Sequence, residues 1–282
     1  MIFMMSKFRI PKAAMMGIFF GIVFLVWILL VLIFRPSHDR DWELGQERLP
    51  RFLFQGGEMT IENFRNFDWK SAGVADVRYE TRVFNLDDIA GVDVFISHFD
   101  GFEGLAHIFL SFGFSDGRHV VVSVETRREE GEEFSPVLGV LRQFEIIYVV
   151  GSEADIVGLR TDIRDERVYL YKTVASREKA RELLLKVAED VNGIYGQPRI
   201  YNTLTHNCTN ELTRRVEDIS DVKFPLTWKT MLPGYFDEVL YGMGLIEAAG
   251  DFSETKRRNL IDNTRVDRYS PRYEYELRAI SH

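Results

Sequence analysis

An uninterrupted apolar stretch over residues 13–34 constrains this chain more than any other feature of its sequence. Its 22 residues carry no charged side chain, and about 20 apolar residues in a helix are enough to cross the hydrocarbon core of a bilayer. The stretch is followed by Arg35 and Pro36, without the small residues of a signal-peptide cleavage site. We therefore predict a transmembrane helix over 13–34 that acts as an uncleaved signal anchor.

The charges that flank this helix predict its orientation. Lys7, Arg9 and Lys12 precede it without any acidic residue, whereas the basic residues that follow it are interleaved with acidic ones. Under the positive-inside rule, residues 1–12 stay in the cytoplasm and the chain from about residue 35 onward is exported.

The exported part has the composition of a folded domain with no nucleic-acid partner. Hydrophobic residues make up 46% of the chain, which excludes a disordered protein. The residues after the anchor include 32 basic and 43 acidic ones, a net charge of -11, which argues against binding to a phosphate backbone. No linker-like segment divides the interior, so we expect a membrane-proximal segment over 35–58 and one domain over 59–282.

Cys208 is the one cysteine of the chain. A lone cysteine excludes an intrachain disulfide, a cysteine-rich zinc site and a redox CxxC pair. In an oxidising compartment it is either a reactive or intermolecularly paired thiol, or a buried residue that packs as a small hydrophobe.

Alternation of apolar and polar residues predicts an antiparallel sheet in the first two thirds of the exported part. The clearest element is a hairpin whose strands, 106–114 and 119–126, flank Asp116 and Gly117, because Asp-Gly between apolar runs is a strong turn signal. Further strands are expected at 74–86, 92–99, 144–150 and 168–171.

Two helices are expected later in the chain, at 176–195 and 208–219. Cys208 opens the second helix, with Asn207 as its N-cap. The positive potential and free N–H groups of a helix start lower the pKa of a thiol there. The same N–H groups can also receive the oxyanion of an acyl-transfer intermediate.

A thiol nucleophile needs a base, usually histidine, which a third polar group orients. His107 is the candidate because it interrupts an apolar strand, where a polar ring must be either satisfied or used. The strand also fits a histidine that has no catalytic role and only forms hydrogen bonds in the core. His98 is a weaker candidate for the base.

The hairpin predicts the third group. With a three-residue loop at 115–117, Glu125 lies opposite His107 and Ser123 shares its face, whereas a two-residue loop would place Thr126 there instead. We expect Glu125, with Ser123 second. The alternative is that Glu125 belongs to a solvated run of charges that continues to Glu130.

The chain resembles the circularly permuted papain-like thiol enzymes of the NlpC type. The resemblance is carried by a histidine on one strand, a polar residue on the next strand, and a helix that begins with Asn-Cys much later in the sequence. More closely, the chain resembles the Lnb N-terminal periplasmic domain family. The segments that carry this resemblance are NFRNFDW, AHIFLSFGFSDGRHVVVSVETRREEGEEF, FEIIYVVGSEADIVGLRT, YNTLTHNCTNEL and LPGYFDEVLYGMGLI.

The resemblance implies an α+β fold and a role in lipoprotein N-acylation at the inner membrane of Gram-negative bacteria. Cys208 would take a fatty acyl group from a phospholipid and pass it to the α-amino group of a lipoprotein. His107 would be the base, Glu125 or Ser123 would orient it, and Asn207 or the N–H of Cys208 would serve the oxyanion. The alternatives are a Cys-His hydrolase acting on envelope substrates and a non-catalytic binding domain. The sequence has no metal-ligand spacing or phosphate-binding glycine loop, so we expect no cofactor.

Overall fold

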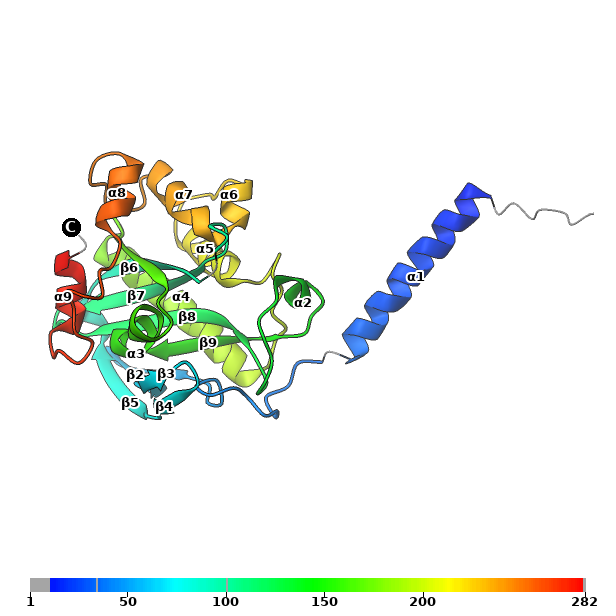
Figure 1. Cartoon of the computed structure of the whole chain (residues 1–282). Coiled ribbons are helices and arrows are strands. Elements are labelled where there is room, and N and C mark those ends of the chain that lie inside the picture. The colour runs from blue at the N-terminus through cyan, green and yellow to red at the C-terminus, as the bar shows by residue number, and fades with distance from the viewer. Residues whose placement is uncertain (1–10, 34, 100, 281–282) are drawn as a thin grey trace, which may run out of the picture.

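The computed structural model describes residues 11–33, 35–99 and 101–280, which form one apolar helix and a mixed α+β domain (Figure 1). Its strands are β1 (Arg51–Gln55), β2 (Glu58–Arg65), β3 (Asp68–Ser71), β4 (Val74–Asp76), β5 (Tyr79–Asn85), β6 (Ile89–His98), β7 (His107–Phe114), β8 (His119–Arg127), β9 (Glu145–Gly151) and β10 (Arg167–Lys172). Its helices are α1 (Lys12–Ile33), α2 (Pro136–Val140), α3 (Glu153–Gly158), α4 (Arg177–Gly196), α5 (Cys208–Ile219), α6 (Trp228–Met231), α7 (Phe236–Gly242), α8 (Phe252–Arg258) and α9 (Tyr273–Ile280). Short helical turns lie at η1 (Leu86–Asp88), η2 (Leu159–Ile163) and η3 (Pro233–Tyr235).

The helix α1 matches the expected membrane anchor. It is long and apolar enough to cross a membrane, and none of its residues is buried against the rest of the chain. Lys7, Arg9 and Phe34, on which part of the prediction depends, lie outside the described residues.

The sheet of the domain has the strand order β1-β2-β9-β8-β7-β6-β10, and β5 pairs with β2. Its pairings are antiparallel, as expected, except for a parallel contact between β2 and β9. The strand predicted over 74–86 is instead two strands, because β4 pairs with β3 in a small separate sheet while β5 joins the main one. The expected helix at 208–219 is confirmed as α5, and that at 176–195 as α4, displaced by one residue.

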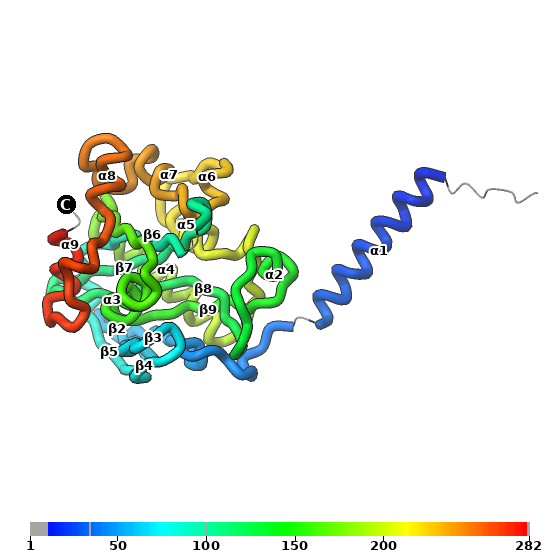
Figure 2. The backbone as a smooth tube through the Cα atoms, in the orientation of Figure 1, coloured from blue at the N-terminus to red at the C-terminus, as the bar shows by residue number. Residues whose placement is uncertain are grey.

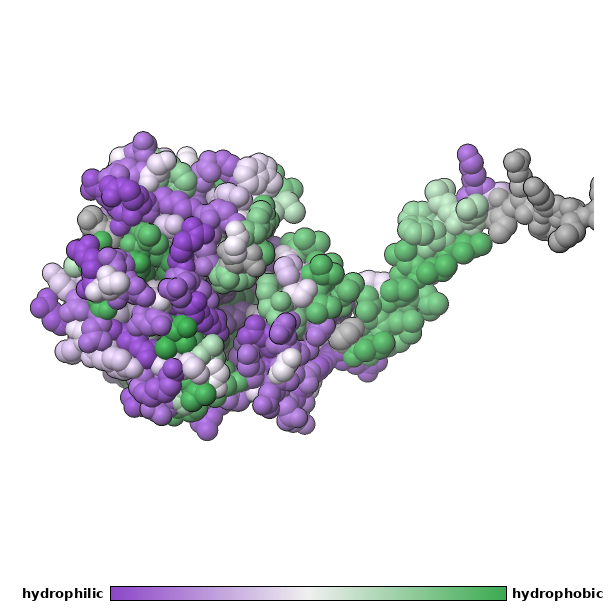
Figure 3. Space-filling view, in the orientation of Figure 1, coloured by the Kyte–Doolittle hydropathy of each residue, from purple (hydrophilic) through white to green (hydrophobic). Residues whose placement is uncertain are grey.

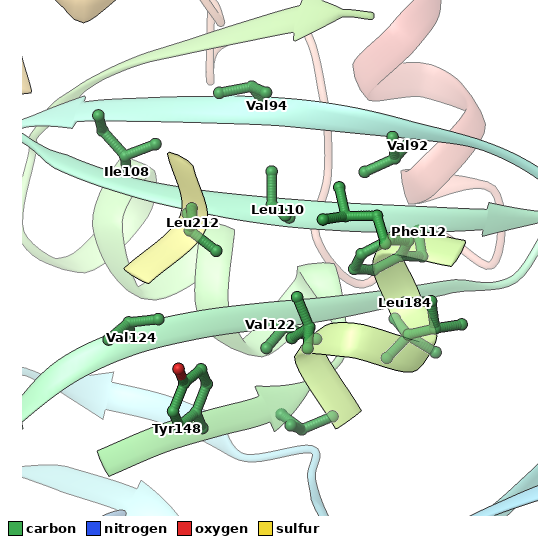
Figure 4. Close-up of a cluster of buried hydrophobic side chains, with 14 of the residues drawn as sticks. Val92, Val94, Ile108, Leu110, Phe112, Val122, Val124, Tyr148, Leu184 and Leu212 are labelled. Atoms are coloured by element: carbon green, nitrogen blue, oxygen red, sulfur yellow. The ribbon is translucent and has the colours of Figure 1, made fainter. Parts of the chain in front are cut away.

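The two faces of the sheet bury different helices. Side chains at even positions of β7, such as Ile108 and Leu110, pack with Leu184 of α4 and Leu212 of α5 (Figure 4). The alternate position Phe109 lies on the other face, in a cluster with residues of α3 and α9. This alternation follows from the two-residue period of a strand and gives the sheet a core on each side.

The hairpin of β7 and β8 has the register that a three-residue loop requires. Phe109 pairs with Ser123 and Gly113 with His119, so continuing the ladder by two residues places His107 opposite Glu125. Gly117 has a φ of +85° and donates its N–H to the carbonyl of Phe114 at 3.0 Å. A residue without Cβ adopts this left-handed conformation at little cost, which explains the Asp-Gly pair.

The segment that follows the anchor packs on the domain. The N–H of Ser37 donates to Glu145 at 3.2 Å, Trp42 forms an isolated bridge with Glu129, and β1 pairs with β2. The boundary expected at residue 59 therefore falls inside the β1–β2 hairpin. Figure 2 shows this segment, in blue, reaching the domain on the side where α1 lies.

Asp155 connects α3 to the end of β2 and to β3. Its fully buried carboxylate accepts two hydrogen bonds from Arg65 at 2.9 Å, one from the N–H of Phe67 at 2.8 Å and one from the indole of Trp69 at 2.8 Å. A buried carboxylate is stable only when it is paired and hydrogen-bonded in this way.

We expect Asp155→Ala to destabilise the domain by about 3–5 kcal/mol, because it leaves the Arg65 guanidinium buried without a partner. The measurement is the urea midpoint of the full chain in detergent micelles, followed by near-ultraviolet circular dichroism. Glu189→Ala is the control, since Glu189 is exposed and pairs only with Lys186, and it should change stability by no more than about 0.5 kcal/mol. Equal effects of the two substitutions would contradict this role of Asp155.

Candidate active site

A pocket of about 390 Å³ lies where β7 begins and α5 begins. It contains the predicted nucleophile Cys208 and the predicted base His107, together with Glu125. Its other lining residues come from the β6–β7 loop, from α2 and the residues before it, from η2 and the turn after it, and from the segments around α5 and α6. The pocket thus collects residues from segments that are up to 134 positions apart in the sequence, from Phe99 to Pro233.

Three side chains on one face of the β7–β8 hairpin form a hydrogen-bonded chain. Nε2 of His107 lies 2.7 Å from Oγ of Ser123, and this hydroxyl donates to Oε1 of Glu125 at 2.8 Å. The carboxylate itself is 3.9 Å from Nε2. Ser123 therefore contacts the ring directly, whereas Glu125, the residue expected first, acts on it mainly through the serine.

The direction of these hydrogen bonds fixes the tautomer of His107. The single proton of the Ser123 hydroxyl goes to Glu125, so the oxygen must accept a hydrogen bond from Nε2–H. The lone pair of the neutral ring is then on Nδ1, at the opposite edge of the imidazole. The ring is held further by stacking on Phe109, with centroids 5.7 Å apart.

Arg160, which was not predicted from the sequence, completes this chain. Its guanidinium donates to Oε1 of Glu125 at 2.9 Å and to the carbonyl of Ile156 at 2.8 Å, and it lies over the ring of Phe109 at 4.8 Å. Arg160 belongs to η2, a π-helical turn that continues α3. Such turns often occur at functional sites, but no local sequence pattern indicated this one.

Burial and the charges around His107 keep its imidazole ring neutral. Burial, reinforced by the nearby Arg160 guanidinium, lowers the pKa of His107 to about 3. Burial alone would raise the pKa of Glu125, but Arg160 and His107 hold it below its ordinary value. The resting site therefore has a neutral imidazole beside a carboxylate that Arg160 neutralises.

Cys208 occupies the first position of α5, as expected, and Asn207 caps the helix by accepting a hydrogen bond from the N–H of Asn210 at 2.8 Å. The thiol is buried and faces the backbone N–H of Ile108, the residue after His107. Burial raises the pKa of the thiol, and the N–H groups of Ile108 and Thr209 offset this only in part. The expectation of a lowered thiol pKa is therefore wrong, because desolvation outweighs the helix start.

His107 and Cys208 line one pocket but are not hydrogen-bonded to each other among the described residues. His107 shares its face of the sheet with Phe109, whereas Cys208 belongs to the core on the α5 side. Each residue is the first of its element, and both side chains line the pocket at this end of the sheet. Unliganded catalytic sites are often loose in this way.

The structure distinguishes the two candidates for the oxyanion. Both ends of the Asn207 carboxamide are engaged, one with Asn210 and the other with the carbonyl of Thr203 at 2.6 Å. One amide hydrogen of Asn207 is thus already used, whereas Cys208 is at the first position of α5, where a backbone N–H has no partner within its helix. Tyr201, whose role the sequence did not show, also lines the pocket; burial and the nearby Cys208 raise the pKa of its phenol.

The remaining candidates lie differently. Thr126 lines the pocket, but the observed register gives the position opposite His107 to Glu125. His98 is buried outside the pocket lining, and its ring contacts Tyr169 edge to face. Neither ring nitrogen of His98 is hydrogen-bonded to any residue that the structure describes.

Three side chains of types that can bind a metal ion come together away from the pocket, at the other end of the sheet. They are His119, Glu153 and Glu274. The guanidinium of Arg278 already donates to Glu153 at 2.6 and 2.9 Å. The same guanidinium also pairs with Asp93 at 2.8 Å, so Glu153 is already held by a cation that two carboxylates share. That the protein uses no cofactor stays a prediction.

The pH dependence of thiol alkylation tests these pKa shifts. The pKa of Cys208 is raised, so the reactive thiolate forms only at alkaline pH, and the pKa of His107 is so low that the ring does not titrate between about pH 5 and 8. We expect the rate of iodoacetamide alkylation, followed by mass spectrometry, to rise about tenfold per pH unit from about pH 6 to 9. His107→Ala should keep this slope. A rate that is constant from about pH 5 upward would instead show a resting thiolate–imidazolium pair.

Residues 75–234 match the family model of the Lnb N-terminal periplasmic domain. The match spans more than half of the chain and includes every residue of the pocket chemistry described above. No curated protein and no solved structure gives a significant match. Together with α1, the match fits a single-pass membrane protein with a periplasmic domain. The chain belongs to the Lnb N-terminal periplasmic domain family.

Proposed function

We propose that this protein is a thiol acyltransferase of the bacterial envelope, with its N-terminus in the cytoplasm and its domain in the periplasm. It would move a fatty acyl chain from a phospholipid to the α-amino group of a lipoprotein's N-terminal cysteine. The order of histidine before cysteine corresponds to a circularly permuted papain-like arrangement.

One observation carries this proposal: a single pocket is lined by the buried thiol of Cys208 at a helix start and by His107 and Glu125, which the buried Ser123 connects by hydrogen bonds. A nucleophile, an oriented base and free N–H groups are the three components that acyl transfer requires. A thiol that only fills space in the core would not need a polar chain on the adjacent strands.

The first half of the reaction forms a thioester. Nδ1 of His107 accepts the thiol proton as the sulfur of Cys208 attacks the ester carbonyl of the phospholipid, and the N–H of Cys208 donates to the oxyanion. The intermediate then collapses by breaking the carbon–oxygen ester bond. The leaving alkoxide takes the proton from His107 and departs as a lysophospholipid, so that the enzyme carries the acyl group on sulfur.

The second half transfers the acyl group to an amine. The α-amino group of the lipoprotein attacks the thioester carbonyl and gives one proton to Nδ1 of His107. Collapse breaks the carbon–sulfur bond, forms the amide and returns the proton to the sulfur of Cys208. A neutral histidine suits both halves, since it must begin each of them as a proton acceptor.

The pocket lining suits a phospholipid. Apolar side chains including Phe134, Leu204 and Leu232 form one part of it, where an acyl chain would lie. Arg160 and Arg164 form another part. The Arg164 guanidinium is only loosely paired, with Glu166 at 3.7 Å, so it is available to a phosphate group.

The test maps N-terminal lipoprotein peptides by mass spectrometry in a strain that lacks other N-acyltransferases. The wild-type chain should restore N-acylation, Cys208→Ala should abolish it, and His107→Ala should lower the rate by about 10²–10⁴-fold because it removes the general base. Normal N-acylation by both variants would exclude the proposed role.

Two further variants make the assay specific. Arg164→Gln should weaken acylation through a higher KM for phospholipid, whereas Arg181→Gln, an exposed residue of α4, should leave it unchanged. Release of free fatty acid without acylated lipoprotein would indicate the hydrolase instead. An unreactive Cys208 that is indifferent to the His107 change would indicate a binding domain.

A further inference from the structure

Exposed apolar side chains surround the mouth of the pocket. We call six of them the apolar rim: Phe99, Val137, Leu204, Leu226, Trp228 and Met231. Val137 is 66% exposed and Leu226 is 92% exposed. A single exposed apolar residue is ordinary on a protein surface, but a group of them around a pocket suggests a binding surface. Figure 3 shows hydrophobic side chains gathered over α2 and beside α6, on the side of the domain from which α1 extends.

The segments that carry the rim contact one another around the pocket. Thr203 donates to the carbonyl of Pro136 at 2.9 Å, which joins the Leu204 loop to α2. The rings of Phe99 and Phe134 lie 6.3 Å apart, edge to face. Phe99, Leu204 and Met231 also line the pocket itself. These contacts place the rim residues of α2, of the Leu204 loop and of the β6–β7 loop around one pocket.

The η3 turn fixes the α6 side of the rim against the β6–β7 loop. The N–H of Gly234 donates to the carbonyl of Gly104 at 3.2 Å. A Cβ at position 234 would lie only 1.8 Å from the carbonyl oxygen of Glu103. Only glycine allows this approach, so the rim residues before it are held in place.

The connection to α1 brings the same face close to the membrane. The helix ends at Ile33, and Ser37 already donates its N–H to Glu145 at the start of β9. Four residues span at most about 14 Å. The residues between β8 and β9 include α2, so the part of the domain that this short link holds near the bilayer includes the α2 side of the rim.

We propose that the apolar rim inserts into the outer leaflet of the membrane that holds α1. The pocket then opens directly to lipid, and an acyl chain enters it without crossing water. Trp228 fits such a surface, because tryptophan is enriched at membrane interfaces, and apolar side chains that dip into the headgroup region bind by buried area. This inference goes beyond the proposed acyl transfer and does not depend on it.

The experiment measures contact with lipid in the full chain, reconstituted into phosphatidylcholine vesicles. In a Cys208→Ser background, single cysteines replace Val137 or Leu226 and are labelled with an environment-sensitive fluorophore. Tyr275→Cys on α9 is the matched control, since this residue is 63% exposed and α9 lies at the opposite end of the domain (Figure 1). Doxyl-labelled lipids then quench whichever labels lie in the bilayer.

We expect quenching at positions 137 and 226 to exceed that at position 275 by about twofold or more, as for residues at the acyl boundary. The difference should persist in about 1 M salt, where charge attraction is screened. Quenching at the rim equal to the control, or lost in salt, would overturn the inference. Since the background lacks the thiol, neither outcome depends on acyl transfer.

Discussion

The pairing of β7 with β8 is the constraint on which the candidate site depends. Because Phe109 lies opposite Ser123, the face that carries His107 also carries Ser123 and Glu125. A shift of β8 by one residue would place Thr126 opposite His107 and turn Ser123 and Glu125 to the other face of the sheet. The turn at Gly117 sets this register from the far end of the hairpin.

The environment of the site explains why the imidazole of His107 and the thiol of Cys208 are neutral at rest. The sheet end buries both the ring of His107 and the thiol of Cys208, and desolvation opposes charge on each. Arg160 neutralises Glu125, so the carboxylate orients the histidine through Ser123 without making it strongly basic. Under the proposed function, proton transfer from the thiol would begin only once a substrate carbonyl lies beside the sulfur.

Local patterns predicted much of the fold and the chemical groups, but not their surroundings. The Asp-Gly turn gave the hairpin register, and the Asn-Cys helix start gave the position of the thiol. Arg160 and Tyr201 could not be found this way, because their roles depend on contacts with residues far away in the sequence. The raised thiol pKa was missed for a related reason, since burial is a property of the packed chain.

The central claim is that Cys208 carries an acyl group during the reaction. The direct test is the intact mass of the protein after incubation with a phospholipid that has an isotope-labelled acyl chain. The account predicts one labelled acyl group on Cys208, which neutral hydroxylamine removes, as expected for a thioester. The Cys208→Ser variant should gain no label that hydroxylamine removes. An unmodified Cys208 in a preparation that N-acylates lipoprotein would contradict it.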